Sequence, residues 1–155
     1  MRGRKKTPKR KIAPDPKFGN VKVAKFINYI MRRGKKTVAQ KVVYQAFEII
    51  SNQTKGNPVE FFDKAIKNIA PALEVRGRRI GGANYQIPIV VQNERKLILA
   101  FRWLINAARA KKGKPMAQKL AEEIMAAAKG EGDAIKKRED VHRMAEANRA
   151  FAHFA

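Results

Sequence analysis

Apolar residues recur every three to four positions along most of the chain, which is the spacing that places them on one face of a helix. The first such pattern runs from Val23 to Ile30 and ends at Arg32-Arg33-Gly34, where basic residues precede a helix-closing glycine. The second runs from Val38 to about Asn52. Both segments are therefore predicted to be helices that bury one face.

A third helix has the clearest start in the chain. Asn57 suits the N-cap, Pro58 the first helical position, and Glu60 follows three residues after the cap. Pro71 ends this helix. Three more helices are predicted after residue 91: Asn93, as a cap, to about Ala110; Lys114-Pro115 to Lys129; and a long final helix after the turn Gly130-Glu131-Gly132-Asp133.

The segment from Leu73 to Val91 has a different pattern, with period two. Apolar and aromatic residues alternate with others from Tyr85 to Val91, which predicts a strand, and Val75 to Ile80 is its partner. Gly81-Gly82-Ala83-Asn84 supplies the turn, because glycine and asparagine tolerate positive φ. The expected fold is mainly α: a bundle of about six helices with a protruding two-stranded β-ribbon.

Composition limits the size and the partners of this fold. With 155 residues, 45% of them hydrophobic, the chain suits one domain spanning 1–155. Lys and Arg number 35 against 13 Asp and Glu, a net charge of +22, which favours a nucleic-acid partner over an anionic membrane surface. There is no cysteine, secretory signal or membrane span, so a cytoplasmic location is expected.

Basic residues are densest at the N-terminus, in residues 1–20. Asp15 is the single acid there, and three prolines oppose helix formation. We expect an extended arm that a partner orders. The basic residues of the arm are Arg2, Arg4, Lys5, Lys6, Lys9, Arg10, Lys11 and Lys17.

The helix beginning at Asn93 carries a regular stripe of arginines. Arg95, Arg102 and Arg109 recur every seven residues, opposite an apolar face. Such a stripe can be an ordinary solvated face. However, residues 95–121 contain no acid, and the stripe continues into Lys111, Lys112, Lys114 and Lys119. We therefore favour phosphate binding, since guanidinium matches phosphate in bidentate geometry.

Three further groups of residues can be interpreted in more than one way. The ribbon arginines Arg76, Arg78 and Arg79 favour nucleic-acid contact over a merely protective charged edge, because glycines beside them allow close backbone approach. Tyr85 suits either base stacking or packing on the ribbon root, and Trp103 suits the edge of the core. The cluster between the first two helices suits both phosphate binding and stabilisation of a helix C-terminus; it consists of Arg32, Arg33, Lys35 and Lys36.

The residues needed for catalysis are scarce. Ser51 is the only serine, and His142 and His153 are the only histidines, without the spacing of a metal motif. Glu122 and Glu123 are adjacent on a helix and face different directions, which is poor geometry for paired-carboxylate catalysis. We expect no enzyme activity, no catalytic residues, no cofactor and no metal.

Several strings resemble the bacterial type of the small-subunit ribosomal protein seven family over nearly the whole length. They are Ile12-Ala13-Pro14-Asp15-Pro16-Lys17-Phe18, Lys25 to Met31, Gly34-Lys35-Lys36, Gly81 to Pro88, Ala100-Phe101-Arg102-Trp103 and Lys136 to Arg149. The resemblance implies a helical bundle with a β-ribbon. It also implies a primary binder of small-subunit ribosomal RNA of the 16S type that organises the 3′ major domain, the head.

The resemblance further implies where contacts lie. The ribbon is expected near the exit-site tRNA and the mRNA path, and ribosomal proteins of the head and platform are expected as neighbours. The implied RNA contacts are Lys9, Arg10 and Lys11, the Gly34-Lys35-Lys36 turn, the ribbon arginines, the helix from Asn93, and the Lys114-Pro115-Met116 turn.

Two other classes of protein compete with this interpretation. A DNA-architectural protein also uses a basic β-arm, which enters a minor groove and bends the duplex. A nucleic-acid enzyme would need acids or metal ligands that the sequence lacks. The leading hypothesis is a structural RNA-binding protein that neutralises phosphates and holds several RNA helices in one arrangement.

Overall fold

A computed structural model describes residues 11–154 and confirms a mainly helical fold with one two-stranded ribbon. The elements are α1 (Val21–Ile30), α2 (Lys36–Thr54), α3 (Pro58–Ile69), β1 (Leu73–Ile80), β2 (Ala83–Val90), α4 (Asn93–Ala110), α5 (Met116–Lys129), α6 (Asp133–Ala147) and the 3₁₀ helix η1 (Arg149–Phe154). Among these described helices, none is both long enough and apolar enough to cross a membrane.

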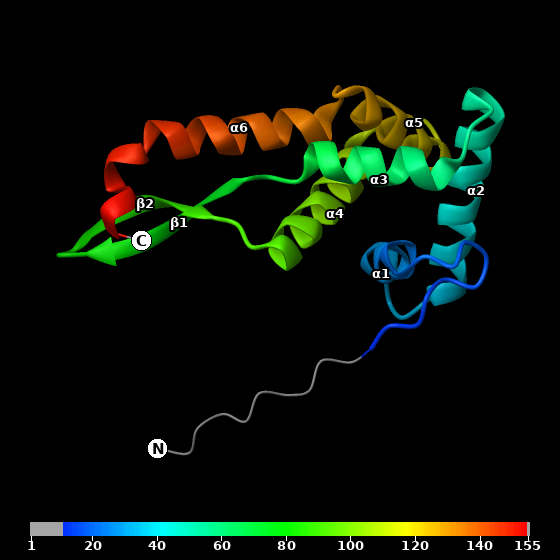
Figure 1. Ribbon diagram of the computed structural model, residues 1–155, viewed down its shortest axis with the longest axis horizontal. Helices are drawn as coiled ribbons and strands as arrows, with labels where there is room; N and C mark the ends of the chain where they lie inside the picture. The colour runs from blue at the N-terminus through cyan, green and yellow to red at the C-terminus, as the bar shows by residue number, and fades with distance from the viewer. Residues whose placement is uncertain (1–10, 155) are drawn as a thin grey trace, which may run out of the picture.

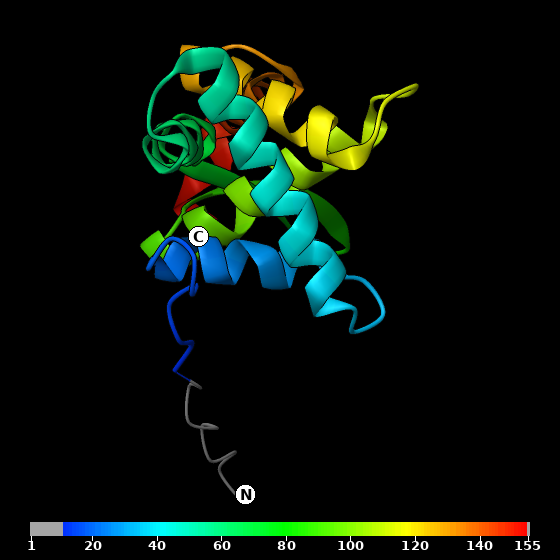
Figure 2. The same ribbon diagram turned by 90° about the vertical axis from the view of Figure 1, so that its right-hand side faces the viewer.

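The helices surround one aromatic-rich core. Phe26 of α1, Phe47 of α2, Phe62 of α3 and Phe101 of α4 are fully buried, and the Phe26 ring centroid lies 4.9 Å from that of Phe62 and 5.2 Å from that of Phe101. Trp103 packs at the edge of this core, as predicted. The helix α2 crosses the end of the molecule that Figure 2 faces, while the ribbon and α6 extend from the opposite end (Figure 1).

Two helix starts have a capping side chain, at α1 and α3, whereas the cap predicted for α4 is absent. Asn20 accepts a hydrogen bond from the Lys22 backbone N–H (2.8 Å), and Asn57 accepts one from Val59 (3.0 Å) just before Pro58. The predicted cap at Asn93 is wrong: this residue is already helical, and no side chain caps α4. The first turn of α4 contains no apolar residue, and an ion pair between Arg95 and Glu74 ties it to β1.

The ribbon is regular and its turn is shorter than predicted. The register runs from Leu73 opposite Val90 to Ile80 opposite Ala83, so Ala83 and Asn84 already belong to β2. Only Gly81 and Gly82 form the loop, with φ of 55° and 90°. A two-residue loop with both φ positive matches the twist of the strands, which explains the two glycines.

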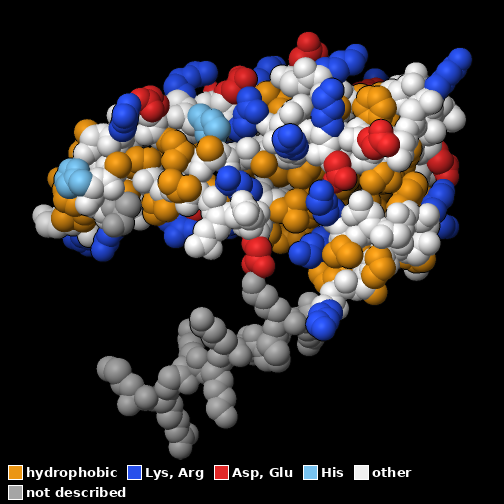
Figure 3. Space-filling view, in the orientation of Figure 1, with side chains coloured by type: hydrophobic (Ala, Val, Ile, Leu, Met, Phe, Trp, Pro, Cys, Tyr) orange, Lys and Arg blue, Asp and Glu red, His pale blue; other side chains and the backbone are white. Residues whose placement is uncertain are grey.

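The ribbon does not project alone, because α6 lies along it and η1 folds back onto β2 (Figure 1). The Ala72 backbone N–H donates to His142 Nε2 of α6 at 3.0 Å. The Tyr85 ring centroid lies 5.2 Å from that of Phe151 and 5.8 Å from that of Phe154. In Figure 3 apolar side chains gather where α6 and η1 cover the ribbon. The segment after α5 thus braces the ribbon.

Part of the expected N-terminal arm is docked. Asp15 is buried, accepts hydrogen bonds from the backbone N–H groups of Lys17 and Phe18 (both 3.1 Å), and accepts one from the Tyr44 hydroxyl (2.8 Å). Burial, followed by the Asp15 hydrogen bond and charge, raises the pKa of Tyr44 to about 12. This turn is not the free arm that its charge predicts, because a buried carboxylate and the Phe18 ring fix it to α2. Arg2, Arg4, Lys5, Lys6, Lys9 and Arg10 lie outside the described residues.

Candidate nucleic-acid interface

The turn between α1 and α2 presents four basic side chains to solvent. Arg33 and Gly34 both have positive φ, 52° and 73°, which reverses the chain within a few residues. Arg32, Arg33, Lys35 and Lys36 are all exposed. No side chain caps α2, so the positive end of this helix adds to the charge of the turn. The cluster predicted from sequence is a compact cationic surface.

The end of α4 meets this turn. The Arg109 guanidinium reaches back and donates to the Ile30 carbonyl of α1 at 3.3 Å. Burial, and then the charge of nearby Arg32, lower the pKa of Arg109. Arginine still stays protonated at neutral pH. Two guanidiniums from distant parts of the sequence are therefore held near one another.

These residues surround a hollow of about 340 Å³, which we call the junction hollow. It lies where the ends of α1 and α4 meet the starts of α2 and α5. Its floor is apolar and its cations are arginine and lysine. The lining residues are Ile30, Met31, Arg32, Lys35, Val38, Ala39, Val42, Arg109 and Met116. Three segments that the sequence marked separately are brought together here.

The basic turn between α4 and α5 is partly neutralised by acids of α5. Lys111 Nζ lies 2.8 Å from Oε2 of the fully buried Glu123, and Lys114 Nζ lies 2.5 Å from Glu122 Oε1. The hydrogen bond from Lys114 is the main cause that lowers the pKa of Glu122. Lys112 is exposed and has no hydrogen bond or ion pair within residues 11–154. Of the three lysines, Lys112 is the most available to a phosphate.

The arginine stripe of α4 is divided among three environments. Arg95 Nε donates to Glu74 Oε2 at 3.2 Å, and Arg109 belongs to the junction hollow. Arg102, between them, is exposed and makes no ion pair with any described residue. The three arginines are evenly spaced along the helix, but they do not form one continuous cationic surface, because Arg95 pairs with Glu74 of β1.

The ribbon arginines are also divided. Arg76 Nη2 donates to Glu74 Oε1 at 2.7 Å. Burial of Glu74 opposes its ionisation, but the hydrogen bonds from Arg76 and Arg95 outweigh that effect and lower its pKa. Arg78 donates to the Phe154 carbonyl at 2.6 Å, and Arg79 is exposed. Tyr85 lies near the loop of the ribbon and packs against the rings of Phe151 and Phe154 of η1, not on the ribbon root.

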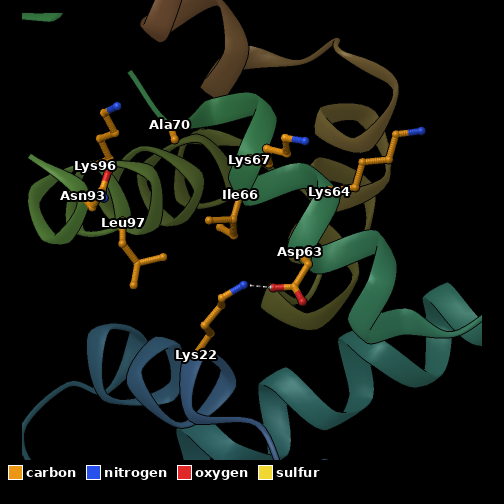
Figure 4. A pocket seen from close by; sticks show the side chains of 9 residues that line it. All are labelled: Lys22, Asp63, Lys64, Ile66, Lys67, Ala70, Asn93, Lys96 and Leu97. Atoms are coloured by element: carbon orange, nitrogen blue, oxygen red, sulfur yellow. Dashed lines mark hydrogen bonds and ion pairs between the residues drawn. The ribbon is translucent and has the colours of Figure 1, made fainter. Parts of the chain in front are cut away.

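Two features were missed at the level of sequence. Glu74 gathers two of the predicted RNA-binding arginines, and the only signal was a lone acid within a basic strand. A second hollow, of about 540 Å³, carries the four lysines Lys22, Lys64, Lys67 and Lys96 between α1, α3 and α4. In Figure 4 Lys22 reaches across its opening to Asp63, with Nζ and Oδ1 2.9 Å apart. That ion pair reduces the positive charge of the hollow.

The described residues hold no group of three or more His, Cys, Asp or Glu that could bind a metal ion. Lys11, at the start of the described chain, is exposed. The chemistry available is therefore that of cations and apolar surface, arranged on helix ends and on the ribbon. Such a set neutralises and positions a polyanion.

Comparisons with known proteins agree with this chemistry. The model of the family described as ribosomal protein S7p/S5e matches residues 2–149. Small ribosomal subunit protein uS7 of Thermotoga maritima is 62% identical over 151 residues, 97% of each chain. Those of Polynucleobacter necessarius and Moorella thermoacetica are 55% and 54% identical over 154 residues, 99% of each chain. The chain belongs to the ribosomal protein S7p/S5e family.

Proposed function

We propose that the surface around the junction hollow binds small-subunit ribosomal RNA of the 16S type directly and organises its 3′ major domain, the head of the subunit. As a member of its family, the chain is a structural, non-enzymatic constituent of the small ribosomal subunit. A place in the ribosome agrees with the cytoplasmic location expected from the sequence. No finding favours the DNA-architectural alternative.

One observation carries the proposal. Arg32, Lys35 and Arg109 converge on the junction hollow, and no carboxylate lines it. Cationic side chains held this near to one another repel until an anion lies between them. The net charge of +22 on the whole chain adds to that repulsion. RNA phosphates supply that anion, and the counterions released from the RNA add to the affinity.

The other predicted contacts form a second, weaker set. Arg102 on α4, Lys112 in the connection after α4, and Arg79 on β1 are all exposed and suit phosphates of different RNA helices. The residues of the arm, Lys11 among them, extend this set. The ribbon extends, with α6 along it, away from α1 and α2 (Figure 1), which suits a projection toward exit-site tRNA and mRNA. Neighbouring proteins of the head and platform would contact the surfaces that RNA leaves free.

Equilibrium binding of the full chain to an RNA fragment of the 3′ major domain tests the proposal. We expect tight binding at physiological salt, resistance to an equal nucleotide concentration of duplex DNA, and chemical footprints at a junction of RNA helices. Displacement of the RNA by duplex DNA would favour the architectural alternative. Footprints spread evenly along the fragment would contradict an organising role.

A further inference from the structure

We propose that the junction hollow holds an unpaired nucleobase of the bound RNA, with the phosphate of that nucleotide on Arg32 and Arg109. This inference rests on the proposed function and goes beyond phosphate binding, because it assigns a base to the apolar floor. RNA that is recognised in single-stranded regions presents such bases, splayed out of the helical stack.

The floor of the hollow is apolar although cations surround it. Val38 is 54% exposed, whereas Val42, Met31 and Met116 are partly buried beside it. Val38 is one of few large apolar side chains so exposed in the described chain, and it stands among Arg32, Lys35 and Lys36 in sequence. A surface that bound phosphate alone would gain nothing from this apolar floor. A nucleobase has both an apolar face to cover it and a phosphate to engage the cations.

The charge of the lining separates this hollow from the others. Four other sizeable hollows of the described chain each include a carboxylate in their lining: Asp63, Glu94, Glu122 or Glu74. The junction hollow includes none. Its volume of about 340 Å³ lies within the range of pockets that hold small organic molecules, roughly 300–1,000 Å³. An anionic ligand with a flat apolar part fits both properties.

The position of Arg109 gives the site a fixed geometry. Its hydrogen bond to the Ile30 carbonyl holds the guanidinium at the rim, where remaining N–H groups can donate to phosphate. Met31, just after α1, and Met116, at the start of α5, both line the hollow and have unbranched side chains that adapt to a flat ring. The N-terminal arm is a poor occupant, because its basic residues carry the same sign of charge as this rim.

An abasic scan of the RNA tests the inference. The probe is the 3′ major domain fragment in which single unpaired nucleotides carry no base but keep their phosphate. With the unchanged protein we expect one position to weaken binding about tenfold, the order of one base contact, without a change in salt dependence. With Val38→Asn this loss should shrink to about twofold or less, because the floor is already impaired.

Val21→Asn is the matched control, since Val21 is 43% exposed at the start of α1 and lies outside the hollow. It should reproduce the tenfold loss. Thermal unfolding checks that both variants fold. The proposal is contradicted if no abasic position weakens binding, or if the tenfold loss persists in Val38→Asn. The apolar floor would then be assigned to contact with a neighbouring protein. Failure of the intact fragment to bind would instead contradict the proposed function.

Discussion

Replacing Glu123 by alanine should destabilise the fold clearly, whereas Glu122→Gln beside it should not. Glu123 is fully buried in α5 and has two partners. Its Oε1 accepts the Ala134 backbone N–H at 3.0 Å in the first turn of α6, where Gly132 offers no capping side chain. Its Oε2 lies 2.8 Å from Lys111 Nζ. One carboxylate thus caps α6 and neutralises Lys111 in the turn before α5.

The size of the effect follows from these contacts. A hydrogen bond to a charged group contributes about 1.5–3 kcal/mol, and loss of the buried methylene costs about 0.8 kcal/mol more. The Lys111 side chain is 28% exposed and can turn to water once its partner is gone. The loss of about 3–5 kcal/mol that follows when a fully buried ion pair is broken is therefore an upper limit for this variant. We expect a loss of about 2–4 kcal/mol, a fall in Tm of roughly 5–15 °C for a chain of this length.

Thermal and urea unfolding followed by circular dichroism measure this loss. Glu122→Gln is the control, because Glu122 pairs with Lys114 at the surface and such pairs contribute about 0–1 kcal/mol. Glu123→Gln keeps an acceptor for Ala134 and should fall between the two. Equal midpoints for Glu123→Ala and the unchanged chain would refute the capping role, and equal losses for both glutamates would refute the importance of burial.

Three further outcomes are expected. Arg102→Ala should weaken RNA binding and lower the slope of log affinity against log salt by about one unit, and an unchanged slope would assign Arg102 to a solvated face. Burial, and then Arg138, lower the pKa of His142. His142 therefore contributes its full stabilisation above about pH 6.5, and this stabilisation is lost as the pH falls through the pKa of His142 in the folded state. The urea midpoints measured above and below this pH range should differ less in His142→Gln than in the unchanged chain. Gly132→Ala should lower Tm, because φ is +99° and its Cβ would lie 2.8 Å from Glu123 Oε1; an unchanged Tm would show that the backbone relaxes freely there.

The elements could be predicted because burial follows local periodicity. The apolar face of α1, with Val23 and Phe26 fully buried, is visible in the sequence, as are the glycines of the ribbon loop. Helix ends were less certain where no side chain caps them, as at Asn93. Local patterns therefore predicted the types of element better than their first residues.

The partners of individual charges could not be predicted, because they depend on elements far apart in the chain. Arg95 and Arg102 are equivalent in the sequence pattern, yet only Arg95 meets Glu74. Similarly, the pairing of Lys111 with Glu123 requires the packing of α5 against α4 and α6. Convergence on the junction hollow is also a tertiary property, although each basic segment that forms it was identified.

The brace on the ribbon links the shape of the molecule to the order in which it is synthesised. The strands β1 and β2 precede α6 and η1 in the chain, so a growing polypeptide forms the ribbon before the helix that supports it. The residues of the junction hollow, from Ile30 to Met116, are also complete before α6 emerges. In a growing chain the lining of the hollow is therefore complete while the ribbon still lacks its support from α6 and η1, so a hollow that binds RNA as proposed would be available before the ribbon is braced.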